Sequence, residues 1–229
     1  MRTSSALRHI TDKLHCVDSD VWERGVHLRL RMNIVELGDG RLWLCAPGPI
    51  GEHIGLAIGA LGEVSHIVAP NLNHYKFVPE AKRRFPNAVV YGAPGLATKR
   101  PALPIARTLE EPHEVGGGMS AIHIQGMPDV NEFVFYHRPS ATLICTDLVQ
   151  NVQDEDGFMT RLLYRAIGSW KKFGQNRYWK YRTRDRAAAR ASLERVLAWD
   201  FDRIVMAHGD IVQTGGREKL RASLAWLFG

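Results

Sequence analysis

The stretch IVAPNLNHYKF, from Ile67 to Phe77, decides how the rest of the sequence is interpreted. An apolar run of strand character ends in Asn71, Asn73 and His74, and this spacing is typical of metal ligands placed just after a strand. Two of the three residues carry an amide, which is a weak and neutral ligand for a transition metal. Three interpretations are open: a metal site, the remains of one, or an ordinary loop.

Two other polar residues follow apolar runs in the same way. Asp147 comes after TLICT, and His208 comes after RIVMA. Together with His74 they offer two imidazoles and one carboxylate, a ligand set that suits zinc or iron and leaves positions for water and substrate. Each residue alone also has an ordinary interpretation, as a hydrogen-bonded histidine or as an aspartate that caps a turn or helix.

The order of elements predicts an α/β (α+β) protein. Residues 26–45 alternate in polarity and turn at GDG, which predicts a β-hairpin, and helices and strands then alternate as far as residue 92. The second half predicts consecutive strands, a helix over 185–199, a strand that ends at His208 and a closing helix. This order suits two sheets packed face to face with helices outside. We find no repeat or linker, so we predict one domain over residues 1–229.

These motifs resemble the metallo-β-lactamase superfamily. The resemblance rests on the element order from Val26 to Phe228 and on four stretches, which are GDGRLWLCAPG, NLNH, LICTD and IVMAHGD. It implies a four-layer αββα sandwich with a metal site at one edge, between the two sheets. The family motif His-x-His-x-Asp-His is degraded here. With its last histidine placed on His74, the other three ligand positions hold Ala69, Asn71 and Asn73.

The rest of the family's ligand set is also incomplete. The family's isolated third histidine falls near Gln125, Met127 and Pro128, its bridging aspartate falls on Asp147, and its last histidine falls on His208. The resemblance therefore implies that the three-histidine site is erased, while the second site keeps His74, Asp147 and His208. Asp210, in HGD, is expected to orient His208 through a hydrogen bond.

Two functions follow from that pattern. One is a hydrolase with a single zinc, iron or manganese ion that cleaves an anionic ester, thioester, amide or phosphoester, with Asp147, Asn73 and Glu132 as catalytic candidates. Glu132 begins a predicted strand, so it is either a ligand or base, or a carboxylate at a sheet edge that faces water. The other function is a metal-free relative that binds a ligand or a protein. The remaining strand histidines are expected to be packed or paired: His66, His123 and His137.

The positive charge of the chain is concentrated in one segment. Residues 161–190 contain ten Lys or Arg and one acid, a net charge of +9 against +6 for the whole chain. This basic, aromatic segment belongs to a predicted helical insertion at about 151–186. We expect Asn71, Lys171 and Arg177 to bind substrate, and we expect this segment to recognise a small anionic molecule. Alternatives are single-stranded nucleic acid, a phospholipid surface, or lysine and arginine stems that cover aromatic rings.

The bulk composition limits the class of protein. An apolar fraction of 45% and a charged fraction of 24% are ordinary for a globular domain. Cys16, Cys45 and Cys145 are too few and too far apart for a disulfide framework, and we expect Cys45 and Cys145 to be buried thiols. With no apolar signal at the N-terminus, we expect a cytoplasmic protein. The sequence does not indicate an oligomeric state.

Overall fold

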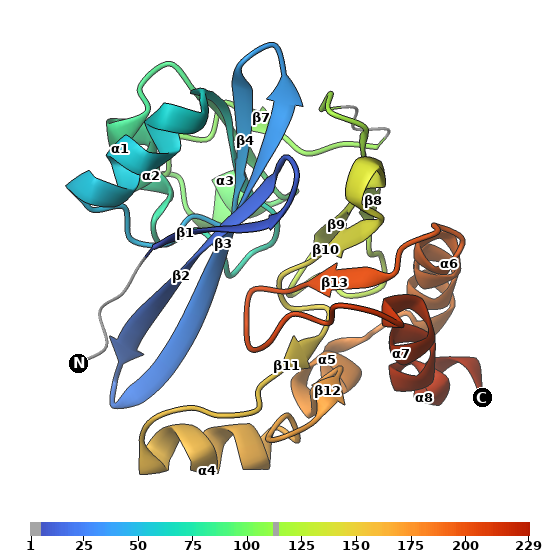
Figure 1. The fold of residues 1–229 in the computed structure, drawn as a ribbon. Helices are drawn as coiled ribbons and strands as arrows, with labels where there is room; N and C mark the ends of the chain where they lie inside the picture. Colours follow the sequence, from blue (N-terminus) through green and yellow to red (C-terminus); the bar gives the residue numbers. More distant parts are fainter. Residues whose placement is uncertain (1–5, 112–114) are drawn as a thin grey trace.

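The first half of the chain forms a seven-stranded sheet. The computed structural model describes residues 6–111 and 115–229. Within them, the strands of this sheet lie side by side in chain order (Figure 1): β1 (Leu7–Thr11), β2 (Leu14–Glu23), β3 (Val26–Gly38), β4 (Arg41–Cys45), β5 (Glu63–Ala69), β6 (Val89–Gly92) and β7 (Arg107–Thr108).

Connections set the direction of these strands. Short turns connect each strand from β1 to β4 with the next one, so these neighbouring strands pair antiparallel. Longer crossovers join β4 to β7, so those strands are parallel, and the crossovers carry three helices. The helices are α1 (Glu52–Leu61), α2 (Val78–Arg84) and α3 (Leu96–Lys99). The predicted hairpin at 26–45 and the predicted alternation of helices and strands as far as residue 92 are confirmed.

The second half forms a four-stranded sheet in the order β13-β10-β9-β8. Strands β8 (Met119–His123), β9 (Phe133–His137) and β10 (Thr142–Ile144) pair antiparallel, and a 3-10 turn (Arg138–Ser140) joins the last two. Strand β13 (Arg203–Val205) returns parallel to β10. As a result, β10 and β13 end at the same edge of the sheet, which sets the place of the site described below.

Three apolar clusters divide the molecule into four layers. Ile34, Ile58 and Ile67 belong to the cluster between the first sheet and its helices. Trp43 and Phe135 meet between the two sheets, with ring centroids 4.8 Å apart. The third cluster lies between the second sheet and α6 (Arg186–Leu197), α7 (Gly216–Ser223) and α8 (Ala225–Phe228). The predicted αββα sandwich is confirmed (Figure 1).

The predicted insertion lies at one end of the molecule. It contains β11 (Gln150–Asn151), α4 (Phe158–Ala166), β12 (Phe173–Gly174) and α5 (Arg177–Arg182), and β11 pairs with β12 in a separate small sheet (Figure 1). No helix of the described residues is long and apolar enough to cross a membrane. Cys45 and Cys145 are buried free thiols, as predicted, and burial raises the pKa of both.

Two features differ from the sequence analysis. Strands β1 and β2 were not predicted, although β2 pairs with β3 over its whole length. The alternation of β2 is hard to see in the sequence because its first four residues are all buried, whereas its end is exposed. The closing helix is also interrupted at Leu224, between α7 and α8.

Candidate metal centre

Three loops that follow strands bring His74, Asp147 and His208 together. His74 follows β5 of the first sheet, while Asp147 and His208 follow the neighbouring parallel strands β10 and β13 of the second sheet. One ligand atom from each residue lies within 4.8 Å of the others. The site therefore lies between the two sheets at one edge, as the resemblance implied.

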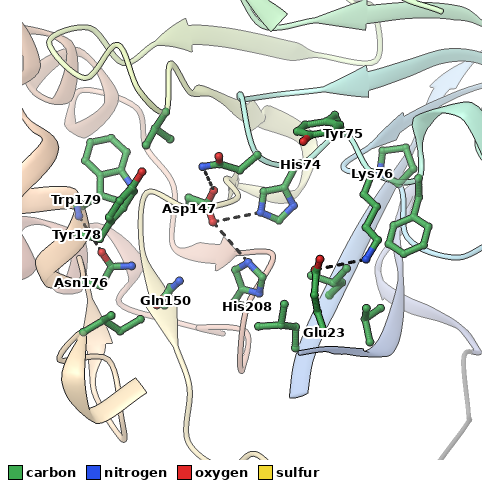
Figure 2. Close-up of a pocket in the computed structure, with 18 residues that line it drawn as sticks. Glu23, His74, Tyr75, Lys76, Asp147, Gln150, Asn176, Tyr178, Trp179 and His208 are labelled. Atoms are coloured by element: carbon green, nitrogen blue, oxygen red, sulfur yellow. Dashed lines mark hydrogen bonds and ion pairs between the residues drawn. The ribbon is translucent and has the colours of Figure 1, made fainter. Parts of the chain in front are cut away.

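Both imidazoles face the same carboxylate oxygen. His74 Nε2 lies 3.2 Å from Asp147 Oδ1, and His208 Nε2 lies 3.5 Å from the same atom (Figure 2). Burial opposes ionisation of Asp147, but the two histidines hold its pKa well below the usual range. The carboxylate is therefore anionic at neutral pH, the form that can bind a metal ion.

Strand β3 holds the loop of His208 in place. His208 Nδ1 lies 3.1 Å from the carbonyl oxygen of Arg29, so Nδ1 donates this hydrogen bond and Nε2 faces the Asp147 carboxylate. The buried Arg31 guanidinium donates to the carbonyl oxygens of Met206 and Gly209, on either side of His208. Orientation of His208 thus comes from the Arg29 carbonyl, whereas Asp210 lies 3.4 Å from the Arg29 side chain instead.

Asn71 organises the loop and does not face outward as a ligand would. Its side chain is fully buried, and its Oδ1 accepts hydrogen bonds from the backbone N–H groups of Asn73 and His74. Its Nδ2 donates to Thr146 Oγ1 and, at 2.8 Å, to Asp147 Oδ2. The second oxygen of Asp147 is therefore bound by an amide, which leaves Oδ1 for the histidine side of the site.

Glu132 lies behind Asp147. It is fully buried and accepts hydrogen bonds from the backbone N–H groups of Thr146 and Asp147 and from the Thr146 hydroxyl. Burial, together with the charge of Asp147, raises the pKa of Glu132 to about 8. The interpretation of Glu132 as a water-facing carboxylate at a sheet edge is wrong, because the second sheet and the Asp147 loop cover it.

His74, Asp147 and His208, called the triad below, line a cavity of about 360 Å³. Asn73 lies beside Asp147 in its wall, with Nδ2 3.5 Å from Oδ2. Most of the other wall residues are apolar or aromatic (Figure 2), and they come from the β2–β3 hairpin, the loop after His74 and the insertion: Val21, Leu28, Leu30, Tyr75, Phe77, Ile167, Tyr178 and Trp179. Gln150 and Asn176 add amides, and Lys76 forms an ion pair with Glu23 at 3.4 Å.

The structure does not bring every predicted substrate-binding residue to this cavity. Asn71 lies beneath it, and Lys171 and Arg177 are not in its wall. The Arg177 guanidinium instead donates to the carbonyl oxygen of Ala166. The hairpin wall and the amide of Asn176 were not predicted from the sequence. Asn176 could have been found from the sequence, because an asparagine directly before a helical segment is a typical N-cap, and this side chain caps α5.

The other histidines behave as predicted. His66 lies 2.8 Å from the Ser65 hydroxyl, and His123 lies 2.6 Å from Asn131. His137 is buried beside Ser140. They are packed or paired, and none belongs to the cluster of possible metal ligands found in the described residues.

Solved structures show the same architecture. The chain is similar to a metallo-β-lactamase from Pontibacter korlensis, with a TM-score of 0.66, 16% identity and coverage of 98% of this chain and 99% of that one. It is similar to the mono-zinc form of the metallo-β-lactamase FIM-1 from Pseudomonas aeruginosa (TM-score 0.65, 16% identity, coverage 96% and 94%). It also covers 60% of the metal-soaked Flv1 flavodiiron core from Synechocystis (97% of this chain, TM-score 0.64, 15% identity).

The chain therefore has the metallo-β-lactamase fold, which confirms the resemblance that the sequence motifs indicated. No family model and no curated protein matches the sequence.

Proposed function

We propose that the protein is a hydrolase that uses one metal ion, held by His74, Asp147 and His208. The observation that carries the proposal is the convergence of these three ligand atoms at the wall of a cavity. The donor set fits one ion, because Oδ1 of Asp147 and the two Nε2 atoms face one another while the remaining polar atoms of Asp147 and His208 have protein partners.

A zinc, iron or manganese ion at this site would supply Lewis acidity and lower the pKa of a bound water. The protein's own residues would position that chemistry. Glu132 and Asn71 fix the backbone and side chain of Asp147, and the Arg29 carbonyl fixes His208. Asn73, in the cavity wall, would donate a hydrogen bond to a substrate oxygen.

The cavity wall supports a particular kind of substrate. Its surface is largely apolar and aromatic, so we infer an ester, thioester, amide or phosphoester with an apolar portion that packs against Leu28, Leu30 and Tyr178. Lys76 places a cation in the wall, so an anionic group on the substrate would compete with Glu23 for it.

Metal content tests the proposal. Protein purified without an affinity tag or added metal is expected to contain about one transition-metal ion per chain, since a three-ligand site retains its ion. His208→Ala should lose the ion. The matched control is His53→Ala, which removes an exposed histidine of α1 and should keep it. Wild-type protein that contains no bound metal, even after dialysis against zinc, would contradict the proposal.

A catalytically inactive, metal-free binding protein is the second candidate. It is favoured by the hydrogen bonds that already satisfy Asp147, since Asn71 donates to Oδ2 and both histidines contact Oδ1. Two results would favour this candidate. Zinc addition would leave the stability of the protein unchanged, and wild type would hydrolyse ester and phosphoester substrates no faster than His208→Ala.

A further inference from the structure

Helix α4 presents an apolar face to solvent. Phe158, Met159 and Leu162 are 72%, 52% and 49% exposed, and Leu163 is 38% exposed. Phe158 and Leu162, like Met159 and Leu163, are four residues apart, so all of them lie along one side of the helix. Thr160 and Tyr164 form the buried side. This is the reverse of an ordinary surface helix, whose apolar side faces the core.

The tip of the β2–β3 hairpin extends this apolar face. Trp22 is 56% exposed, and its ring lies within about 3.4 Å of where a side chain on Gly157 would begin. The ring stacks on His27, whose backbone N–H donates to Thr160 Oγ1. These contacts fix Trp22 beside the start of α4.

Basic side chains flank the apolar face. From Gly157 to Arg184 the chain has eight Lys or Arg and no Asp or Glu. Arg182 and Arg184 are paired with Asp129, whereas the other six basic residues are exposed: Arg161, Arg165, Lys171, Lys172, Arg177 and Lys180. Carboxylates gather just before the first turn of the helix, where Asp154 and Asp156 line a separate hollow with Asp18, Asp20 and His27, on which Trp22 stacks.

Three of these cations line one hollow of about 380 Å³ near the end of α4. Lys172, Arg177 and Lys180 lie in its wall, and the bond from Arg177 to the Ala166 carbonyl ties it to the helix. None of the described residues that line it is a carboxylate. Gln175 also lines the hollow; its Oε1 accepts from Trp226 Nε1, while its buried Nε2 has no hydrogen-bond partner among the described residues. Such a wall suits an anionic phosphate group.

We propose that this face docks on an anionic lipid bilayer, with the apolar side of α4 and Trp22 entering the interface and the basic residues binding headgroup phosphates. An exposed apolar helix side with basic neighbours and an aromatic residue is the pattern of interfacial membrane binding. Met159, Leu162 and Leu163 make half or more of the α4 face aliphatic and offer no stacking surface for nucleic acid bases, so single-stranded nucleic acid is the competing occupant that the test below addresses. Pairing two copies would bring like charges together. The inference does not depend on the metal centre.

Vesicle sedimentation tests the inference, using phosphatidylcholine vesicles with and without about 30% phosphatidylserine. Wild type should bind the anionic vesicles and be released by high salt. Leu162→Glu should lower the partition coefficient about ten-fold or more, because it places a charge in the interface. Lys172→Gln should lower it about five-fold, the effect of one cation near the surface.

Matched controls are available on the other side of the molecule. Leu56→Glu replaces a 63% exposed leucine of α1, and Arg83→Gln removes an exposed cation of α2; both should bind vesicles like wild type. No sedimentation of wild type with anionic vesicles would overturn the inference. The inference would also be overturned if wild type forms a dimer that Leu162→Glu dissociates. It would be overturned as well if wild type binds a single-stranded oligonucleotide but no vesicles, and Lys172→Gln weakens the oligonucleotide binding.

Discussion

At the scale of single residues, the candidate site is built from side chains whose partners are fixed. Asp147 receives an amide on one oxygen and faces two imidazoles with the other. Buried groups elsewhere are less well satisfied. His137 lies at the end of β9 with Nδ1 2.6 Å from Ser140 Oγ, while its Nε2 has no hydrogen-bond partner among the described residues. Such a histidine is costly to charge.

His137 should make stability depend on pH. Burial, with a smaller effect of Lys13, lowers its pKa from 6.5 to about 4. As pH falls from about 6.5 to about 4, the unfolded chain binds a proton that the native protein does not, so stability is lost at up to about 1.4 kcal/mol per pH unit. Urea unfolding between these pH values should show a smaller loss for His137→Asn than for wild type. Equal slopes would contradict the assignment.

At the scale of elements, the loop between β5 and α2 determines the geometry of the site. Asn71 closes this loop by accepting two backbone N–H groups, so the amide that the family resemblance placed at a ligand position has a structural role. The same side chain crosses to the β10 loop. One residue thereby couples the two sheets at the site.

Asn71→Ala should lower the free energy of unfolding by about 3 kcal/mol, because a buried side chain loses four hydrogen bonds, one of them fully buried, and their partners are left unpaired. Asn73→Ala is the matched control. Its amide is exposed and makes only a 3.5 Å contact with Asp147, so the change should cost less than about 1 kcal/mol. Urea denaturation of both variants measures the difference. Equal losses would show that Asn71 does not organise the loop.

At the scale of the whole molecule, the interface between the two sheets carries the fold. Trp43 of β4 and Phe135 of β9 are buried and meet edge to face, so they join strands that lie in different layers. The site lies at the edge of this interface, because His74 comes from one sheet and Asp147 and His208 come from the other. Sheet packing is therefore a condition for the metal centre.

Phe135→Ala should destabilise the protein by about 3–5 kcal/mol, since it leaves a cavity between the sheets. Tyr181→Ala removes a ring that is 84% exposed and should change stability by less than about 0.5 kcal/mol. Thermal unfolding compares the two variants. A small effect of Phe135→Ala would mean that the sheets repack without this ring.

The sequence by itself predicted most of the elements from β3 onward and singled out His74, Asp147 and His208, because alternation, turn residues and polar groups at strand ends are local signals. The αββα layers were implied by the family resemblance of its motifs. Only the tertiary structure decided that Asn71 ties the loops together, that Glu132 is buried behind Asp147, and that Arg177 turns away from the cavity. Each of these depends on contacts between residues far apart in the chain. The same holds for the outward apolar side of α4, whose direction is set by Thr160 and Tyr164 packing against the body of the protein.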